Sequence, residues 1–141
     1  VEPVVPQSEN TPKNLSFGGE SILLVEDNEF VRQVASMMIE QLGYRVTVFS
    51  EPEKCVEEVA AKPDMRIDLL LTDVVMPILN GRQLYEKLSA IRPGLKVLYM
   101  SGYPSNVIIH QGGLEEGINF IQKPFTSNAL GKKIYEAIFP Q

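Results

Sequence analysis

The sequence has a single cysteine, Cys55, and a single histidine, His110, among its 141 residues. One cysteine cannot form a disulfide framework and leaves no ligand set for a cysteine-based zinc site. Basic residues are also few: the sequence has 13 Lys and Arg but 18 Asp and Glu, which gives a formal net charge of −5. A nucleic-acid-binding surface needs clustered Lys and Arg, so the composition argues against such a partner. No apolar run approaches the length of a membrane span, and no signal peptide is visible.

What is present suits an ordinary globular domain. Hydrophobic residues make up 44% of the chain and charged residues 22%, and a chain of this length buries a core without disulfides. We interpret Cys55 as a small apolar residue of a helix. We expect a cytoplasmic location without direct membrane contact. A longer parent protein that is anchored in the membrane by another segment is compatible with this expectation.

The chain divides into a leader and one domain. Residues 1–20 hold three prolines and few large apolar side chains, so they cannot bury enough surface to offset the entropy of ordering them. We expect a flexible linker or tail over residues 1–20 and one domain over residues 21–141. Because the chain begins with Val rather than Met, we also expect it to be a piece of a longer protein.

Short apolar runs alternate with helical periodicity along the domain. The runs 22–25, 69–71 and 95–100 suit central strands of a parallel sheet covered on both faces, whereas 44–49 and 118–120 alternate as half-exposed edge strands do. Apolar residues at helical spacing separate the strands. Helices are expected over 31–42, after a capping-box pattern at Ser50–Glu53, over 84–91, weakly at about 104–111, and over 130–138. This alternation predicts a three-layer α/β sandwich.

Polar side chains stand where the expected strands end. Glu26 and Asp27 follow the first run, Asp73 the third, and Ser101 the fourth, while Lys123 follows the fifth. The carboxyl ends of parallel strands share one edge of a sheet, where functional crevices lie. Three neighbouring carboxylates repel each other unless a cation sits among them, and oxygen-only ligands suit Mg²⁺ better than zinc. A carboxylate beside Mg²⁺ can attack a phosphoryl group, so the pattern predicts a phosphoryl-transfer site.

Four segments of the chain resemble the receiver family of response regulators and hybrid histidine kinases, with a likeness that runs from residue 21 to the end. The segments are Ile22–Asn28, Leu69–Pro77, Tyr99–Tyr103 and Phe120–Phe125. The resemblance implies a flavodoxin-like receiver fold, with a five-stranded parallel sheet of order 2-1-3-4-5 and five helices. It also implies a cis peptide bond between Lys123 and Pro124.

The resemblance further implies a role for each strand-end residue in a phosphorelay. Asp73 is the implied phosphoryl acceptor, Lys123 the cation that contacts the phosphoryl group, and Ser101 the switching hydroxyl. The implied ligands of Mg²⁺ are Glu26, Asp27, Asp73 and the backbone carbonyl of Val75. The implied donor is the phosphohistidine of a histidine kinase or of a histidine phosphotransfer domain. A domain of this kind promotes its own phosphorylation and dephosphorylation.

Three positions depart from the commonest form of the family. Glu26 stands where many members have Asp, which favours contact with Mg²⁺ through water. Ser101 replaces the commoner Thr and keeps the hydroxyl. Phe120 stands where many members have the Tyr of the switch; it can swing inward but has no hydroxyl to donate. We therefore do not expect the tyrosine version of the switch.

The expected partner surface is apolar. Phe30 and Met37 fall outside the core stripe of the first helix, and with Pro124 and Phe125 they are expected to form a docking rim beside the site. The alternative is that they pack against the last helix or the leader. His110 is interpreted as a surface residue rather than a phosphodonor, so the donor is another domain or chain.

Several readings of the whole protein stay open. Because the chain ends soon after the last expected helix, we expect no DNA-binding module to follow, which favours the C-terminal receiver of a hybrid histidine kinase. A free-standing single-domain regulator and a non-phosphorylated scaffold receiver are the alternatives. A flavin-binding electron carrier would need a phosphate-cradling loop where Glu26 and Asp27 stand. A haloacid-dehalogenase-like phosphatase would need an Asp where Val75 stands.

Overall fold

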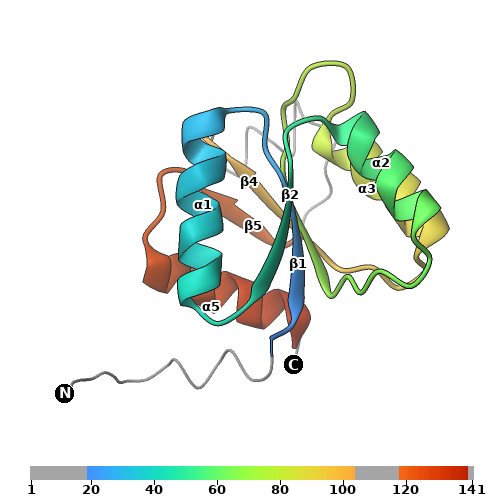
Figure 1. Cartoon of the computed structure of the whole chain (residues 1–141). Coiled ribbons are helices and arrows are strands. Elements are labelled where there is room, and N and C mark those ends of the chain that lie inside the picture. The colour runs from blue at the N-terminus through green and yellow to red at the C-terminus, as the bar shows by residue number, and fades with distance from the viewer. Residues whose placement is uncertain (1–18, 104–117, 140–141) are drawn as a thin grey trace.

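The fold is a five-stranded parallel sheet between two layers of helices. The computed structural model describes residues 19–103 and 118–139 (Figure 1). The strands are β1 (Ser21–Val25), β2 (Arg45–Phe49), β3 (Leu69–Asp73), β4 (Val97–Ser101) and β5 (Phe120–Gln122). They lie in the order β2-β1-β3-β4-β5, and every neighbouring pair is parallel. The predicted strand order is confirmed.

Four helices are described, two on each face of the sheet. They are α1 (Glu29–Gln41), α2 (Pro52–Ala61), α3 (Gly81–Ile91) and α5 (Ser127–Ile138). Helices α1 and α5 cover one face and α2 and α3 cover the other, which gives the predicted three layers (Figure 1). The fourth expected helix at about 104–111, with His110, lies outside the described residues, as do residues 1–18 of the expected tail.

The buried strands explain why the core has two halves. Alternate residues of a strand face opposite sides of a sheet. Leu24 and Leu71 accordingly join the cluster under α1 and α5, while Leu23 and Leu70 join the cluster under α2 and α3. Burying each of these leucines contributes about 2 kcal/mol to stability. The edge strand β2 is mostly exposed or half-buried, as its alternating sequence predicts.

Helix starts follow from local sequence, with one correction. Asn28 caps α1 and Thr126 caps α5, each by accepting a backbone N–H bond. The predicted capping role of Ser50 is wrong, because α2 begins at Pro52 with Glu51 as its N-cap and no side-chain capping bond. Proline suits the first helical position and forces the residue before it into extended backbone, which places the boundary at Glu51.

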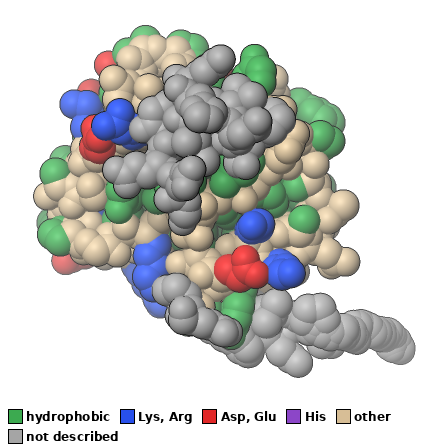
Figure 2. Space-filling model, turned by 180° about the vertical axis from the view of Figure 1, so that it is seen from behind, with side chains coloured by type: hydrophobic (Ala, Val, Ile, Leu, Met, Phe, Trp, Pro, Cys, Tyr) green, Lys and Arg blue, Asp and Glu red, His purple; other side chains and the backbone are tan. Residues whose placement is uncertain are grey.

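The surface mixes charges of both signs. On the face seen in Figure 2, Lys and Arg side chains stand close to Asp and Glu side chains in small groups. Among the described residues, no helix has the length and apolarity needed to cross a bilayer.

Candidate functional site

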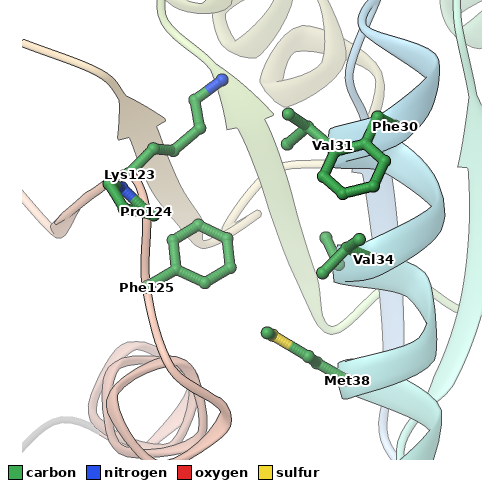
Figure 3. Close-up of a pocket in the computed structure, with 8 residues that line it drawn as sticks. Phe30, Val31, Val34, Met38, Lys123, Pro124 and Phe125 are labelled. Atoms are coloured by element: carbon green, nitrogen blue, oxygen red, sulfur yellow. The ribbon is translucent and has the colours of Figure 1, made fainter.

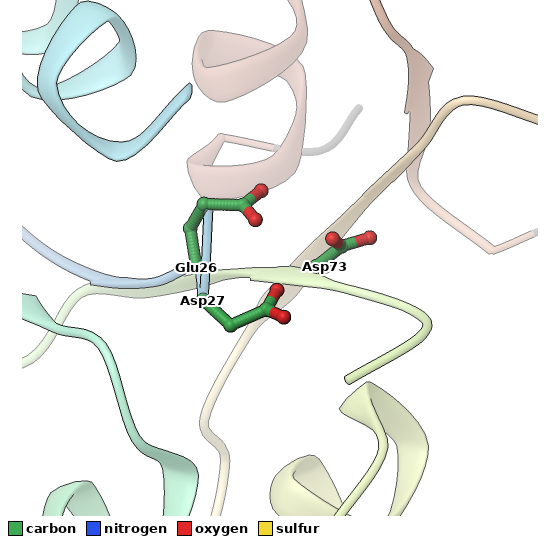
Figure 4. A group of neighbouring side chains, drawn as sticks. All are labelled: Glu26, Asp27 and Asp73. Carbon is green, nitrogen blue, oxygen red and sulfur yellow. The ribbon is translucent and has the colours of Figure 1, made fainter. Parts of the chain in front are cut away.

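Three carboxylates meet at the edge of the sheet where β1 and β3 end. Glu26 and Asp27 directly follow β1, Asp73 ends β3, and these two strands are hydrogen-bonded neighbours. One carboxylate oxygen from each side chain lies within 4.8 Å of the other two (Figure 4). Glu26 is fully buried and Asp73 is only 8% exposed, whereas Asp27 is open to solvent. The structure therefore brings together the three acids that the sequence pointed to.

Lys123 reaches into this acid cluster from the end of β5. Its ammonium nitrogen lies 3.0 Å from Oε1 of Glu26 and 3.1 Å from Oδ2 of Asp73. Burial alone would lower the pKa of Lys123, but the hydrogen bond to Glu26 and the interactions with Asp73 outweigh it and raise the pKa. Lys123 is therefore charged and shared between two carboxylates. The peptide bond between Lys123 and Pro124 is cis, as expected.

Both carboxylate oxygens of Glu26 accept a hydrogen bond from within the protein. Its Oε1 accepts from Lys123, and its Oε2 accepts the backbone N–H of Asn28 at 3.0 Å. Burial raises the pKa of the Glu26 carboxyl and the nearby Asp73 raises it further, while Asn28 and Lys123 oppose that rise. Glu26 thus acts as a fixed counter-charge for Lys123 in this structure.

Ser101 stands close to Asp73 in the sheet, on the neighbouring strand β4. The register pairs Asp73 with Met100, so Ser101 lies one residue further along β4. Ser101 is 2% exposed; its hydroxyl oxygen accepts the backbone N–H of Tyr103 at 3.0 Å. Its carbonyl accepts the backbone N–H of Lys123 at 2.7 Å, which ties the ends of β4 and β5 together.

Phe120 is half-buried on β5, three residues before Lys123. It pairs in register with Tyr99 and packs against the small cluster formed by Val74 and Tyr99. An aromatic ring in a half-buried position can change its packing without breaking a hydrogen bond of its own.

Two further residues, Arg32 and Gly81, position the acids, and the sequence pattern did not predict either role. Arg32 donates from Nη1 to the carbonyl of Glu26 at 2.9 Å and to that of Asp27 at 3.4 Å, so it holds the loop that carries both acids. Gly81 begins α3 against the backbone of Asp73, where a Cβ would lie 2.2 Å from the Asp73 carbonyl oxygen. The Asn80–Gly81 pair followed by Gln83 was the available signal for this tight start, since Asn80 and Gln83 form a capping box.

The expected docking residues separate into two surfaces. Phe30, Pro124 and Phe125 line one pocket of about 320 Å³ between α1 and the β5–α5 loop, where the Phe125 ring faces α1 (Figure 3). The other lining residues include Val31, Val34 and Met38. Met37 lies outside this pocket, in a shallow groove with Arg32 and Val48.

The donor set fits a hard divalent cation. Carboxylate oxygens are the ligands that Mg²⁺ prefers, and the single described cysteine is buried elsewhere on α2. Asp27 is exposed and is not held by Lys123, so its oxygens are available for a ligand.

A comparison with protein-family models matches residues 22–135 to the response regulator receiver domain. Among curated proteins, the chain is 31% identical to the response regulator receiver protein CpdR of Brucella abortus, covering 80% of this chain and 92% of CpdR. It is 27% identical to the sensor kinase CckA of the same organism, covering 99% of this chain but only 15% of CckA.

A solved structure carries a similar domain. The chain superimposes on the receiver domain of the sensor histidine kinase PA1611 from Pseudomonas aeruginosa with a TM-score of 0.70 and 27% identity. The match covers 84% of this chain and 96% of that domain, which was solved with a magnesium ion coordinated in its active site cleft.

Proposed function

We propose that this chain, which belongs to the response regulator receiver domain family, accepts a phosphoryl group from a phosphohistidine on the carboxylate of Asp73. The observation that carries the proposal is the convergence of Glu26, Asp27, Asp73 and Lys123 at one edge of the sheet. In the transfer, an Asp73 oxygen forms a bond to phosphorus as the bond from phosphorus to the histidine nitrogen breaks. The nitrogen keeps the electron pair and takes up a proton.

The chain's own side chains position and neutralise the incoming group. Lys123 already stands 3.1 Å from Asp73, so its ammonium is placed to pair with a phosphoryl oxygen. The Ser101 hydroxyl, on the adjacent strand, would donate to another. Asp73 is nearly buried, which keeps water away from the reacting carboxylate.

We propose that Mg²⁺ is held by Asp27, Asp73 and the backbone carbonyl of Val75, with Glu26 acting through water. The two hydrogen bonds already accepted by Glu26 support an indirect role for this side chain. When bound, Mg²⁺ offsets the negative charge that the phosphoryl oxygens bring to the acid cluster.

Phosphorylation would switch partner contacts through Ser101 and Phe120. When the Ser101 hydroxyl turns toward a phosphoryl oxygen, it leaves the N–H of Tyr103, to which it is now bonded. This movement changes the space at the end of β4, and Phe120, which packs against Tyr99 of β4 from the neighbouring strand β5, responds by moving inward.

The phosphodonor is proposed to be a histidine kinase or a histidine phosphotransfer domain that docks over Phe30, Pro124 and Phe125. Their apolar pocket lies beside Lys123, so a partner seated there reaches the site. We also propose that the chain, with its receiver domain over residues 21–141, is the C-terminal part of a cytoplasmic or membrane-anchored hybrid kinase. The alignment of nearly the whole chain with a small part of the sensor kinase CckA supports this origin.

Acetyl phosphate labelling tests the proposal. The wild-type chain and Asp73→Asn are incubated with acetyl phosphate and Mg²⁺, and intact mass is measured. The expected result is one added phosphoryl group on the wild type and none on Asp73→Asn or in the presence of EDTA. Equal labelling of both chains, or none of either, contradicts the proposed acceptor.

A further inference from the structure

The loop between β3 and α3 contains a strained turn at Ile78. The φ angle of Ile78 is +72°, and it is the one non-glycine residue with positive φ among the described residues. The backbone N–H of Leu79 donates to the carbonyl of Pro77 at 2.7 Å, which closes a γ-turn around Ile78. A γ-turn with positive φ is rare and strained, and a β-branched side chain makes it less favourable still. Local backbone preference therefore does not explain an isoleucine here.

Burial does not explain Ile78 either. Its side chain is 82% exposed, the largest value among the exposed large hydrophobic residues of the described chain. Its neighbours Met76 and Leu79 are buried in the core under α2 and α3, and the N–H of Gly81 donates to the carbonyl of Val74 at 2.9 Å. These contacts anchor the loop, which projects at the carboxyl edge of the sheet (Figure 1). The fold therefore holds an isoleucine in solvent at some energetic cost.

Ile78 belongs to a group of exposed apolar side chains around the acid cluster, which we term the apolar rim. The rim consists of Phe30, Val75, Ile78 and Tyr103, in the segments that follow β1, β3 and β4. It includes the two most exposed large hydrophobic residues of the described chain, Ile78 and Phe30 at 74%. Single exposed apolar residues are ordinary, but their concentration at one edge marks a contact surface.

We infer that Ile78 is a specificity-determining contact for the protein that donates the phosphoryl group, an inference that rests on the proposed function. The occupant is a helix that carries a phosphohistidine flanked by apolar side chains. Asp73 is only 8% exposed and ends β3, at the sheet edge that the rim residues follow, so a histidine on a helix reaches it only if the neighbouring turns cover the rim. Phe30 stands at the start of α1, on the opposite face of the sheet from α3 (Figure 1). Such a helix would therefore contact Phe30 on one side and Ile78 on the other.

A small-molecule phosphodonor distinguishes a lost partner contact at Ile78 from a defect in phosphoryl transfer to Asp73. Acetyl phosphate needs only access to Asp73, whereas a helical donor needs the rim. The variants are Ile78→Gly, which relieves the positive φ, and Ile78→Asn, which tolerates it with a polar side chain. Ile91→Asn makes the same chemical change at another exposed isoleucine, at the far end of α3.

The experiment measures labelling rates with two donors. The protein donor is a purified histidine phosphotransfer domain, phosphorylated with phosphoramidate and chosen from a panel as the fastest donor to the wild-type chain. We expect both Ile78 variants to lower kcat/KM for this donor about fivefold or more, chiefly through KM. Their rates with acetyl phosphate should stay within about twofold of the wild type, and Ile91→Asn should match the wild type with both donors.

Two results would overturn the inference while leaving the proposed function intact. Unchanged transfer from the protein donor to both Ile78 variants would show that no contact is made there. An equal loss with both donors would show that Ile78 supports the site rather than a partner. Failure of the wild-type chain to be labelled by acetyl phosphate would instead contradict the proposed function, and the inference with it.

Discussion

The ammonium of Lys123 lies 3.1 Å from the carboxylate of Asp73, although 50 positions separate them in the chain. It is equally close to Glu26, at 3.0 Å, and Glu26 is fully buried. Two carboxylates therefore depend on one cation. Removing one partner of such an arrangement leaves a buried charge without compensation, which costs more than the net value of the ion pair.

Lys123→Gln is predicted to destabilise the fold and to slow labelling by acetyl phosphate. Near neutral pH the free energy of unfolding should fall by about 2 kcal/mol, less than for a fully buried pair because Lys123 is partly exposed. Denaturant unfolding measures this loss. The loss should shrink as the pH falls, because the pKa of Glu26 is raised in the folded chain, which then holds its proton at a higher pH than the unfolded chain does.

The double variant Glu26→Gln with Lys123→Gln provides the control for that prediction. Because the uncharged Glu26→Gln side chain no longer needs a cation, the double variant should lose less stability than the two single changes added together. Strict additivity would contradict the view that Glu26 and Lys123 depend on each other.

Gly81→Ala is predicted to disturb Asp73 through the backbone. A Cβ at this position would lie 2.2 Å from the carbonyl oxygen of Asp73, so the start of α3 and the end of β3 must move apart. We expect a loss of about 2 kcal/mol or more in the free energy of unfolding, and slower labelling of Asp73. At Gly102, a Cβ would meet no heavy atom within 4 Å, so Gly102→Ala should stay within about 0.5 kcal/mol of the wild type. Equal stabilities for the two variants would refute the close contact.

Ile78→Gly is predicted to stabilise the domain. The φ angle of +72° is costly for a β-branched residue and free for glycine, while the exposed side chain loses little burial. The greater conformational entropy of glycine in the unfolded chain offsets part of this strain relief. We expect a net gain of about 1 kcal/mol in the free energy of unfolding, measured by denaturant unfolding. A loss of stability would mean that the isoleucine is held for packing within the domain.

Cys55 is predicted to weaken the fold at alkaline pH. Burial raises the pKa of the thiol from 9.0 to about 12, so the folded chain keeps a proton that the unfolded chain releases. The stabilising effect of this thiol is complete below pH 9 and is lost as the pH rises through the interval up to about 12. In this interval the free energy of unfolding should fall by up to about 1.4 kcal/mol per pH unit. In Cys55→Ala the free energy of unfolding should fall less steeply above pH 9, by that amount. An unchanged pH dependence would show that folding does not raise the pKa of the Cys55 thiol.

Much of this site could be predicted because it depends on the order of apolar and acidic residues within short stretches of sequence. The apolar runs that end in Glu26 and Asp73 fix both the strands and the edge at which the acids stand. Parallel pairing then brings the carboxyl ends together without further information. The separation of Met37 from Phe30 was not foreseen, since a spacing of seven residues on a helix does not show which neighbour each side chain meets.

Other features depend on contacts that the sequence leaves open. The link from Arg32 to the carbonyls of Glu26 and Asp27 requires a particular side-chain conformation. The α2 boundary was misplaced because a capping-box pattern at Ser50 competed with Pro52, and the fixed backbone of proline decided the outcome. The γ-turn at Ile78 carries no glycine or asparagine to signal positive φ.

The most direct test of the phosphoryl-acceptor role locates the phosphate on the chain. Wild-type protein labelled with acetyl phosphate and Mg²⁺ is reduced with sodium borohydride, which converts an aspartyl phosphate to homoserine, and its peptides are then sequenced by mass spectrometry. We predict homoserine at position 73 and nowhere else, and its loss when EDTA replaces Mg²⁺. Homoserine at position 27, or labelled protein in which Asp73 is unchanged, would contradict the account.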